Sequence, residues 1–128
     1  ISIEDVDLAR ASKRLIVTTE EIIEDEEIRE HPDRTLIPYF IVDAVVKVPY
    51  GSHPGNMPGM YYSDEEHMAE WLTLSRSEEG VQDYFERYVY NVKDFEEYIE
   101  MVGGEEKMEY LRKVEKLEAP LKAPWARR

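Results

Sequence analysis

The first half of the chain alternates charged segments with two runs of β-branched and other apolar residues. Residues 15–19 and 39–48 are almost continuously apolar, a pattern typical of strands that are buried on both faces. A short helix is predicted over residues 3–12, and an edge segment or a short helix with a solvated acidic face over residues 20–30. Because a sheet of two strands is only marginally stable, we expect neighbouring strands from outside this chain or from a second copy.

The second half carries apolar residues at the spacing of amphipathic helices. Four short helices are predicted between residues 64 and 118, and Ser63, Ser77 and Asp94 are predicted to cap the first three at their N-termini. Gly103 is predicted to end the third helix in a left-handed conformation. The positions predicted to face a core include Met68, Trp71, Leu72, Tyr84, Tyr88, Tyr98, Met108, Leu111, Val114 and Leu117.

A loop rich in glycine and proline separates these halves. The sequence thus divides into a helix-strand-strand segment (residues 1–50), the loop (51–63) and a helical segment (64–128), together forming one domain. The loop follows the carboxyl end of a predicted central strand, where open α/β sheets bind ligands. The candidate substrate-binding residues are Tyr50, Gly51, Ser52, His53 and Pro54. Glycine lets a ligand approach the backbone, and the Ser52 and His53 side chains can donate hydrogen bonds. The alternative is a well-packed surface turn.

The charge balance restricts the possible partners. The 128 residues include 29 acidic and 16 basic side chains, which give a formal net charge of −13. This acidic excess argues against binding to nucleic acids and to anionic membranes, since both require a surplus of Lys and Arg. No apolar run reaches the roughly 18 residues of a membrane-spanning helix. The lack of cysteine excludes disulfides and thiolate metal sites, and it is compatible with a cytoplasmic location.

Other candidate chemistry has less support. His31, His53 and His67 are far apart in the sequence, so no metal site is predicted, and His67 is expected to face solvent near the start of a helix. Ser52 beside His53 does not form a nucleophilic triad, so no catalytic residue is assigned. Asp43, an acid within the second apolar run, is either a structural carboxylate with satisfied hydrogen bonds or a site residue.

Several segments, taken in order, resemble one protein family. They are residues 13–23, then Val42-Asp43-Ala44-Val45-Val46 and Tyr50-Gly51-Ser52-His53-Pro54 within residues 37–54, and finally Tyr88-Val89-Tyr90-Asn91-Val92-Lys93-Asp94. Over about residues 5–115 the chain resembles the second half of the alpha subunit of family I CoA-transferases, and within that family the glutaconate CoA-transferase type.

The chain departs from the family pattern at three places. Tyr39 stands where the family usually has glycine, Ser52 replaces alanine, and Asn56-Met57-Pro58 replaces small residues and cysteine. The family's Gly-rich N-terminal region, which binds CoA, has no counterpart here. Since the chain also begins with Ile1, we expect it to be part of a longer chain.

The resemblance implies an α/β fold, the C-terminal portion of a CoA-transferase-type open αβ sheet domain followed by several short helices. It implies part of an alpha subunit that supports transfer of CoA between an acyl-CoA and a free carboxylic acid, inactive as a fragment. The implied partner is a beta subunit whose glutamate attacks the thioester, forms an anhydride and then a glutamyl-CoA thioester, and passes CoA to a second carboxylate. CoA is then a substrate, and no tightly bound cofactor is expected. Residues 50–54 would line the acyl pocket or the contact between subunits.

Two other functions stay open on the sequence alone. One is part of a CoA-ester hydrolase of the same fold family, with water as the acceptor. The other is a non-enzymatic acidic interaction domain that docks a partner through Trp71, the loop and Trp125, which lies in an extended tail predicted over residues 119–125. Self-association through exposed strand edges is also expected.

Overall fold

The chain divides into two compact units. The computed structural model describes residues 3–121, with unit 1 ending at Gly51 and unit 2 beginning at Ser52. Trp125 and the tail beyond residue 121 lie outside the described residues. No helix of the described part combines the length and the apolar character needed to cross a membrane.

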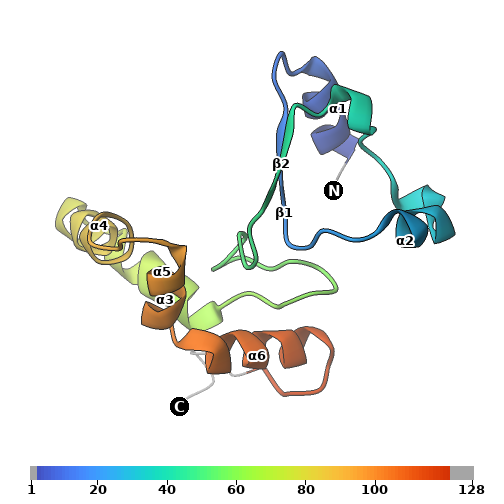
Figure 1. Cartoon of the computed structure of the whole chain (residues 1–128). Coiled ribbons are helices and arrows are strands. Elements are labelled where there is room, and N and C mark those ends of the chain that lie inside the picture. Colours follow the sequence, from blue (N-terminus) through green and yellow to red (C-terminus); the bar gives the residue numbers. More distant parts are fainter. Residues whose placement is uncertain (1–2, 122–128) are drawn as a thin grey trace. The chain divides into compact units, whose positions relative to one another are not determined.

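Unit 1 contains a two-stranded parallel sheet (Figure 1). Its elements are helix α1 (Ile3–Ala11), strand β1 (Ile16–Thr19), helix α2 (Asp25–Glu30) and strand β2 (Ala44–Lys47). Ile16 lies opposite Ala44, and Thr19 lies opposite Lys47. The predicted first helix and first strand are confirmed within a residue, and the alternatives for residues 20–30 resolve in favour of a short helix.

The second strand is shorter than predicted. Tyr39–Ile41 forms a 3-10 turn, in which the Ile41 N–H donates to the Pro38 carbonyl at 3.2 Å, and the strand begins only at Ala44. The prediction of a strand over residues 39–43 is therefore wrong. A short, continuous apolar run does not by itself distinguish a strand from a helical turn. Only the alternation of apolar and polar residues identifies a half-buried strand, and this run has no such alternation.

The strands are also more exposed than predicted. Ile16 is 65% exposed and Val45 is 56% exposed, and all four residues of β2 are exposed. The prediction of burial on both faces is wrong for unit 1 by itself, because no element of unit 1 covers β2. The sequence pattern is that of a covered sheet, and the covering layer is not part of unit 1.

Asp43 is a structural carboxylate. One oxygen accepts the Leu15 N–H at 2.8 Å, and the other accepts from the Arg14 guanidinium at 2.6 Å. The Leu15 N–H and then Arg14 lower the pKa of Asp43 below its ordinary value, against a small opposing effect of burial. These contacts tie the residues before β1 to the residue before β2, and they resolve the two alternatives for Asp43 in favour of the structural one.

Unit 2 is helical. It contains α3 (Glu65–Leu74), α4 (Glu78–Phe85) with a π-helical turn (Glu86–Tyr90), α5 (Phe95–Met101) and α6 (Gly104–Glu115). The predicted caps Ser77 and Asp94 are confirmed, since their side chains accept the N–H groups of Gly80 and Glu97. The cap of α3 is Asp64 rather than Ser63, which moves the start of that helix by one residue. Gly103 has a φ of +126° between α5 and α6, as predicted for a left-handed position.

The core of unit 2 forms around α6. Met108, Leu111 and Val114 are buried as predicted. Leu117 is 92% exposed because it adopts a φ of +60° after the helix ends, so its predicted burial is wrong. Met68 and Leu72 are also exposed, at 39% and 62%. The predicted inward face of α3 is therefore misplaced, since His67 is buried there and Met68 and Leu72 are not.

Candidate functional site

The five candidate substrate-binding residues are divided between the two units. Tyr50 and Gly51 end unit 1, and Ser52, His53 and Pro54 begin unit 2. Tyr50 has a φ of +60°, and its N–H donates to the Glu20 carboxylate at 2.5 Å. A Cβ added to Gly51 would lie 3.0 Å from the Val48 carbonyl oxygen and 3.1 Å from Val48 Cγ1, so this position has little room for a side chain.

In unit 2 the turn at Ser52 is fixed by hydrogen bonds. The Ser52 N–H donates to the Tyr61 hydroxyl at 3.0 Å, and its carbonyl accepts from the Gly55 N–H at 2.7 Å. The Pro54 carbonyl accepts the Asp64 N–H at 2.9 Å. The turn formed by Ser52, His53 and Pro54 is therefore held by backbone contacts to the residues that lead into α3.

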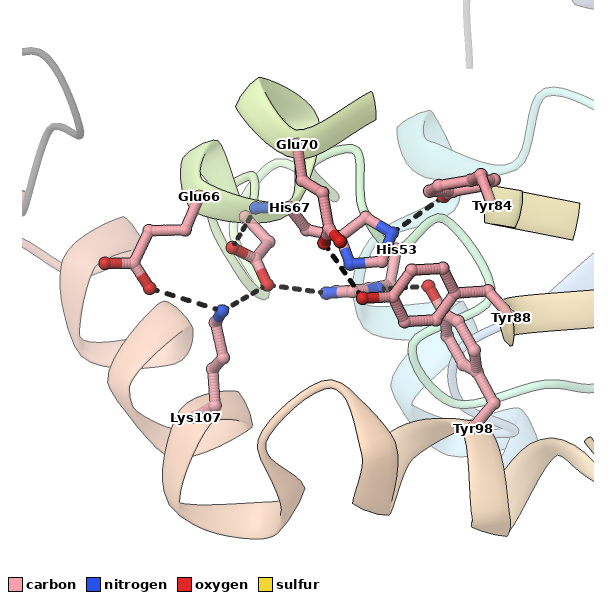
Figure 2. A network of polar contacts seen from close by, with 9 residues as sticks. His53, Glu66, His67, Glu70, Tyr84, Tyr88, Tyr98 and Lys107 are labelled. Atoms are coloured by element: carbon pink, nitrogen blue, oxygen red, sulfur yellow. Dashed lines mark hydrogen bonds and ion pairs between the residues drawn. The ribbon is translucent and has the colours of Figure 1, made fainter. Parts of the chain in front are cut away.

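The His53 imidazole lies at the centre of a buried polar network (Figure 2). None of its side-chain surface is exposed. Nε2 lies 3.2 Å from an Asp64 carboxylate oxygen, and Nδ1 lies 2.7 Å from the Tyr98 hydroxyl. Both ring nitrogens therefore have a partner, and the imidazole is not available to a ligand.

Asp64 joins three elements through one carboxylate. Its side chain is 1% exposed; Oδ1 accepts the His67 N–H at 3.1 Å, and Oδ2 lies 2.7 Å from Lys107 Nζ. Lys107 also lies 3.5 Å from a Glu66 carboxylate oxygen. Burial raises the pKa of Asp64, but the hydrogen bonds from His53, Lys107 and the His67 N–H outweigh burial and hold it far below its ordinary value. Asp64 is therefore ionised at neutral pH.

The prediction that His67 faces solvent is wrong. The residue is 4% exposed, its Nε2 lies 2.7 Å from the Tyr84 hydroxyl, and its ring packs edge-on against Tyr88 with a centroid distance of 4.7 Å. His67 is the third residue of α3, and its N–H donates to the Asp64 cap at 3.1 Å. Burial is the main cause that lowers the pKa of His67, and the nearby His53 adds to the effect.

The three tyrosines predicted as core residues are half-buried, and their hydroxyls are engaged in polar contacts. Tyr84 contacts His67 and Tyr98 contacts His53, while the Tyr88 hydroxyl donates to Glu70 at 2.8 Å. Arg87 also reaches Glu70 at 2.5 Å. Figure 2 shows the tyrosine side chains converging on His53, His67 and Glu70 from α4 (Tyr84), from the π-helical turn (Tyr88) and from α5 (Tyr98). The prediction captured the apolar rings but missed the hydroxyl contacts.

The contacts from Asp64 to His53 and from His53 to Tyr98 resemble a catalytic triad, in which a carboxylate and an imidazole activate a hydroxyl group. The pKa of Tyr98 opposes this role. Burial raises the pKa of Tyr98 well above its ordinary value, so the phenol keeps its proton and is a poor nucleophile. Among the described residues no group of three or more His, Cys, Asp or Glu side chains could hold a metal ion. The network connects the loop to α3 and α5, and α3 to α4, from within unit 2.

A cavity of about 300 Å³ lies beside the Asp64–Lys107 pair. Its lining includes four carboxylates and one ammonium group, from Asp64, Glu65, Glu66, Glu106 and Lys107. Phosphate groups would be repelled by this excess of negative charge. The cavity is therefore unsuited to the phosphates of a nucleotide-like ligand.

We expect the stability of unit 2 to decline as the pH falls from 7.5 to 5.5. Because the pKa of folded His67 lies below its unfolded value of about 6.5, the folded chain binds fewer protons there than the unfolded chain. The stabilisation of the folded state that comes from His67 is therefore fully present above the unfolded pKa of about 6.5, and it is lost as the pH falls from there through the lower folded pKa. His67→Gln should flatten the pH dependence of the urea midpoint, whereas His31→Gln, at an exposed position, should not. An unchanged slope in His67→Gln would contradict this account.

Comparison with known proteins identifies several relatives, although no family model matches the chain. An uncharacterized protein of Archaeoglobus fulgidus is 60% identical over 125 residues, which are 98% of this chain and 28% of the relative. The A subunit of glutaconate CoA-transferase from Acidaminococcus fermentans is 42% identical over 101 residues, or 79% of this chain and 32% of the relative. The A subunit of 3-oxoadipate CoA-transferase from Pseudomonas knackmussii is 34% identical over 90 residues, or 70% of this chain and 31% of the relative.

A solved structure agrees with these relatives. The crystal structure of glutaconate coenzyme A-transferase from Acidaminococcus fermentans superposes with a TM-score of 0.80 at 38% identity, and covers 88% of this chain and 35% of that chain. The chain thus spans about a third of the length of the curated relatives it matches. The predicted resemblance and fold class are confirmed: the chain is a homologue of part of the A subunit, or alpha subunit, of CoA-transferases, and it has the α/β fold of that part.

Proposed function

We propose that this chain is part of an alpha subunit that, with a beta subunit, transfers CoA between an acyl-CoA and a free carboxylic acid. The observation that carries the proposal is the 42% identity to the corresponding subunit of glutaconate CoA-transferase over 79% of the chain, together with the shared fold. Both named relatives are CoA-transferases, which favours transfer over hydrolysis and over a non-enzymatic interaction domain.

The contribution of this chain is support for the substrate contact and not the nucleophile. Asp64, His53 and Tyr98 are each engaged by partners inside unit 2, so none is available to attack a thioester. The resemblance to CoA-transferase alpha subunits implies that the nucleophile is a glutamate of the beta subunit. CoA acts as a substrate, and its phosphates bind away from this acidic chain, since the net charge of −13 disfavours them.

The Tyr50 to Pro54 loop is proposed to contact the substrate. Ser52 is half-buried, and its hydroxyl makes no hydrogen bond to a described residue. Tyr50 holds a left-handed backbone conformation, which costs energy for a residue with a Cβ and is frequent at binding sites. Because the His53 ring is enclosed, its proposed role is to support the loop from within.

The exposed apolar face of unit 1 is proposed to be covered within the assembled enzyme. A groove of about 900 Å³ is lined by residues of both strands, of α2 and of the segment that includes Phe40, and Phe40 is 74% exposed. The proposed cover is the region of the alpha subunit for which this chain has no counterpart. Without that cover the chain is expected to self-associate through its strands, and a strictly monomeric species in sedimentation at high concentration would count against this. A cytoplasmic location remains a prediction from the lack of cysteine.

Co-expression with a candidate beta subunit tests the proposed function. We expect a longer alpha chain that contains these residues to co-elute with the beta subunit in size exclusion and to transfer CoA from an acyl-CoA to a free carboxylate. The 128-residue chain, assayed in parallel, is expected to be inactive alone. Transfer by the isolated chain, or neither a complex nor activity with the longer one, would contradict the proposal.

A further inference from the structure

His53 lies within a continuous series of polar contacts from four different segments. Lys107 on α6 contacts Asp64 at the start of α3, Asp64 contacts His53 in the loop, and His53 contacts Tyr98 on α5 (Figure 2). The imidazole is fully enclosed. A buried polar group that lost its partner would carry the cost of desolvation, so these contacts restrict the ring to a single orientation.

Hydrogen-bond chemistry also restricts the proton on His53. An ionised carboxylate only accepts, so a hydrogen bond between Asp64 Oδ2 and His53 requires the proton on Nε2. In the neutral ring Nδ1 is then an acceptor, and the Tyr98 hydroxyl is a donor that can satisfy it. Each contact in the series thus has one donor and one acceptor.

Asp64 holds the turn at two points. Its side chain contacts the His53 ring, and its backbone N–H donates to the Pro54 carbonyl at 2.9 Å. Replacing the carboxylate with an amide keeps the backbone bond and leaves an oxygen that can still accept the His67 N–H. Asp64→Asn therefore removes the charge opposite His53 while keeping the helix cap.

We propose that Asp64 and Tyr98 are positioning residues, which hold His53 in one orientation with a proton on Nε2 and thereby fix the Ser52–Pro54 turn for substrate contact. The role of the turn in substrate contact rests on the proposed function of the loop. The position of the proton on His53 is a property of the chain alone, and it is measured without a substrate.

The tautomer is measured by long-range ¹H–¹⁵N spectra of the histidine rings in the 128-residue chain. His53 is expected to show a single species with the proton on Nε2. Asp64→Asn and Tyr98→Phe should each convert it to a mixture of tautomers. Asp94→Asn is the matched control for the first, because Asp94 also caps a helix, through the Glu97 N–H at 3.0 Å, and contacts no histidine ring. Tyr110→Phe, which removes a hydroxyl that donates to the Pro120 carbonyl, is the control for the second.

The same substitutions are then assayed in the longer alpha chain, in complex with the beta subunit. Asp64→Asn is expected to raise the KM for substrate about tenfold, equivalent to about 1.4 kcal/mol, and to leave kcat within about twofold, since the nucleophile is elsewhere. If Asp64→Asn does not fold, Tyr98→Phe, which loses one oxygen atom, provides the same test. The controls should keep the KM of the unmodified complex.

The outcomes separate the two proposals. An Nδ1–H ring in the unmodified chain, or an unchanged Nε2–H ring in both Asp64→Asn and Tyr98→Phe, would overturn the positioning role. A variant in which His53 no longer carries its proton on Nε2 but the KM is unchanged would also overturn the positioning role. The turn at residues 52–54 would then not depend on how the His53 ring is held. If the unmodified complex transfers no CoA, the proposed function fails, and the spectra alone decide whether Asp64 and Tyr98 set the tautomer.

Discussion

Asp64→Ala is expected to lower the free energy of unfolding of unit 2 by about 3 kcal/mol, near the lower end of the cost of breaking a buried ion pair. The substitution removes the acceptor for Lys107, His53 and the His67 N–H in one step. The lower end applies because Lys107 is 21% exposed and water can partly replace its lost partner. Urea unfolding followed by circular dichroism measures the loss.

Asp94→Ala provides the matched control. Asp94 also caps a helix, but its side chain is 45% exposed, so its removal should cost clearly less than the removal of the Asp64 carboxylate. Combining Asp64→Ala with Lys107→Met should recover part of the loss, because the unmatched ammonium group is removed together with its partner. Equal losses for Asp64→Ala and Asp94→Ala would show that Asp64 is only a cap.

Met108→Ala is expected to cost about 2–5 kcal/mol, the usual range for truncating a fully buried Met. Its side chain is 0% exposed in the core around α6. By contrast, Val45→Ala in β2 should change the stability of this chain by less than about 1 kcal/mol, because Val45 is 56% exposed. Denaturant unfolding of the two variants gives both values.

The Val45 variant also tests whether the sheet is covered in an assembly. If a layer packs on β2 within a complete enzyme, Val45→Ala should become markedly more destabilising there than in the isolated chain. A large loss already in the isolated chain would contradict the exposure of β2. An equally small loss in both would contradict the proposed cover.

Local features of the fold were predictable from the sequence. Ser77 and Asp94 cap helices as predicted, because capping depends on residues three apart in the chain. The burial of β2 was not predicted correctly, because the apolar pattern reflects a covered sheet and unit 1 alone does not supply the cover. Periodicity describes which face is apolar, and it does not say which other segment packs against that face.

The buried network was largely beyond sequence reasoning. His53 and Tyr98 are 45 residues apart, and no local pattern connects them. Asp64 and Lys107 were missed because each resembles an ordinary charge on a helix. One local signal was available, because an Asp at position 64 can cap a helix through the His67 N–H. Identifying Asp64 as the cap would have corrected the start of the helix, whereas the burial of His67 depends on packing against Tyr84 and Tyr88.

A segment exchange tests the central claim most directly. These residues would replace the homologous segment in the alpha subunit of glutaconate CoA-transferase from Acidaminococcus fermentans, and CoA transfer would be measured in complex with the beta subunit of the same enzyme. The account predicts that the exchanged chain assembles and transfers CoA, with a higher KM when it also carries Asp64→Asn. An exchanged chain that folds and assembles with the beta subunit but transfers no CoA would contradict the assignment of this chain to a CoA-transferase.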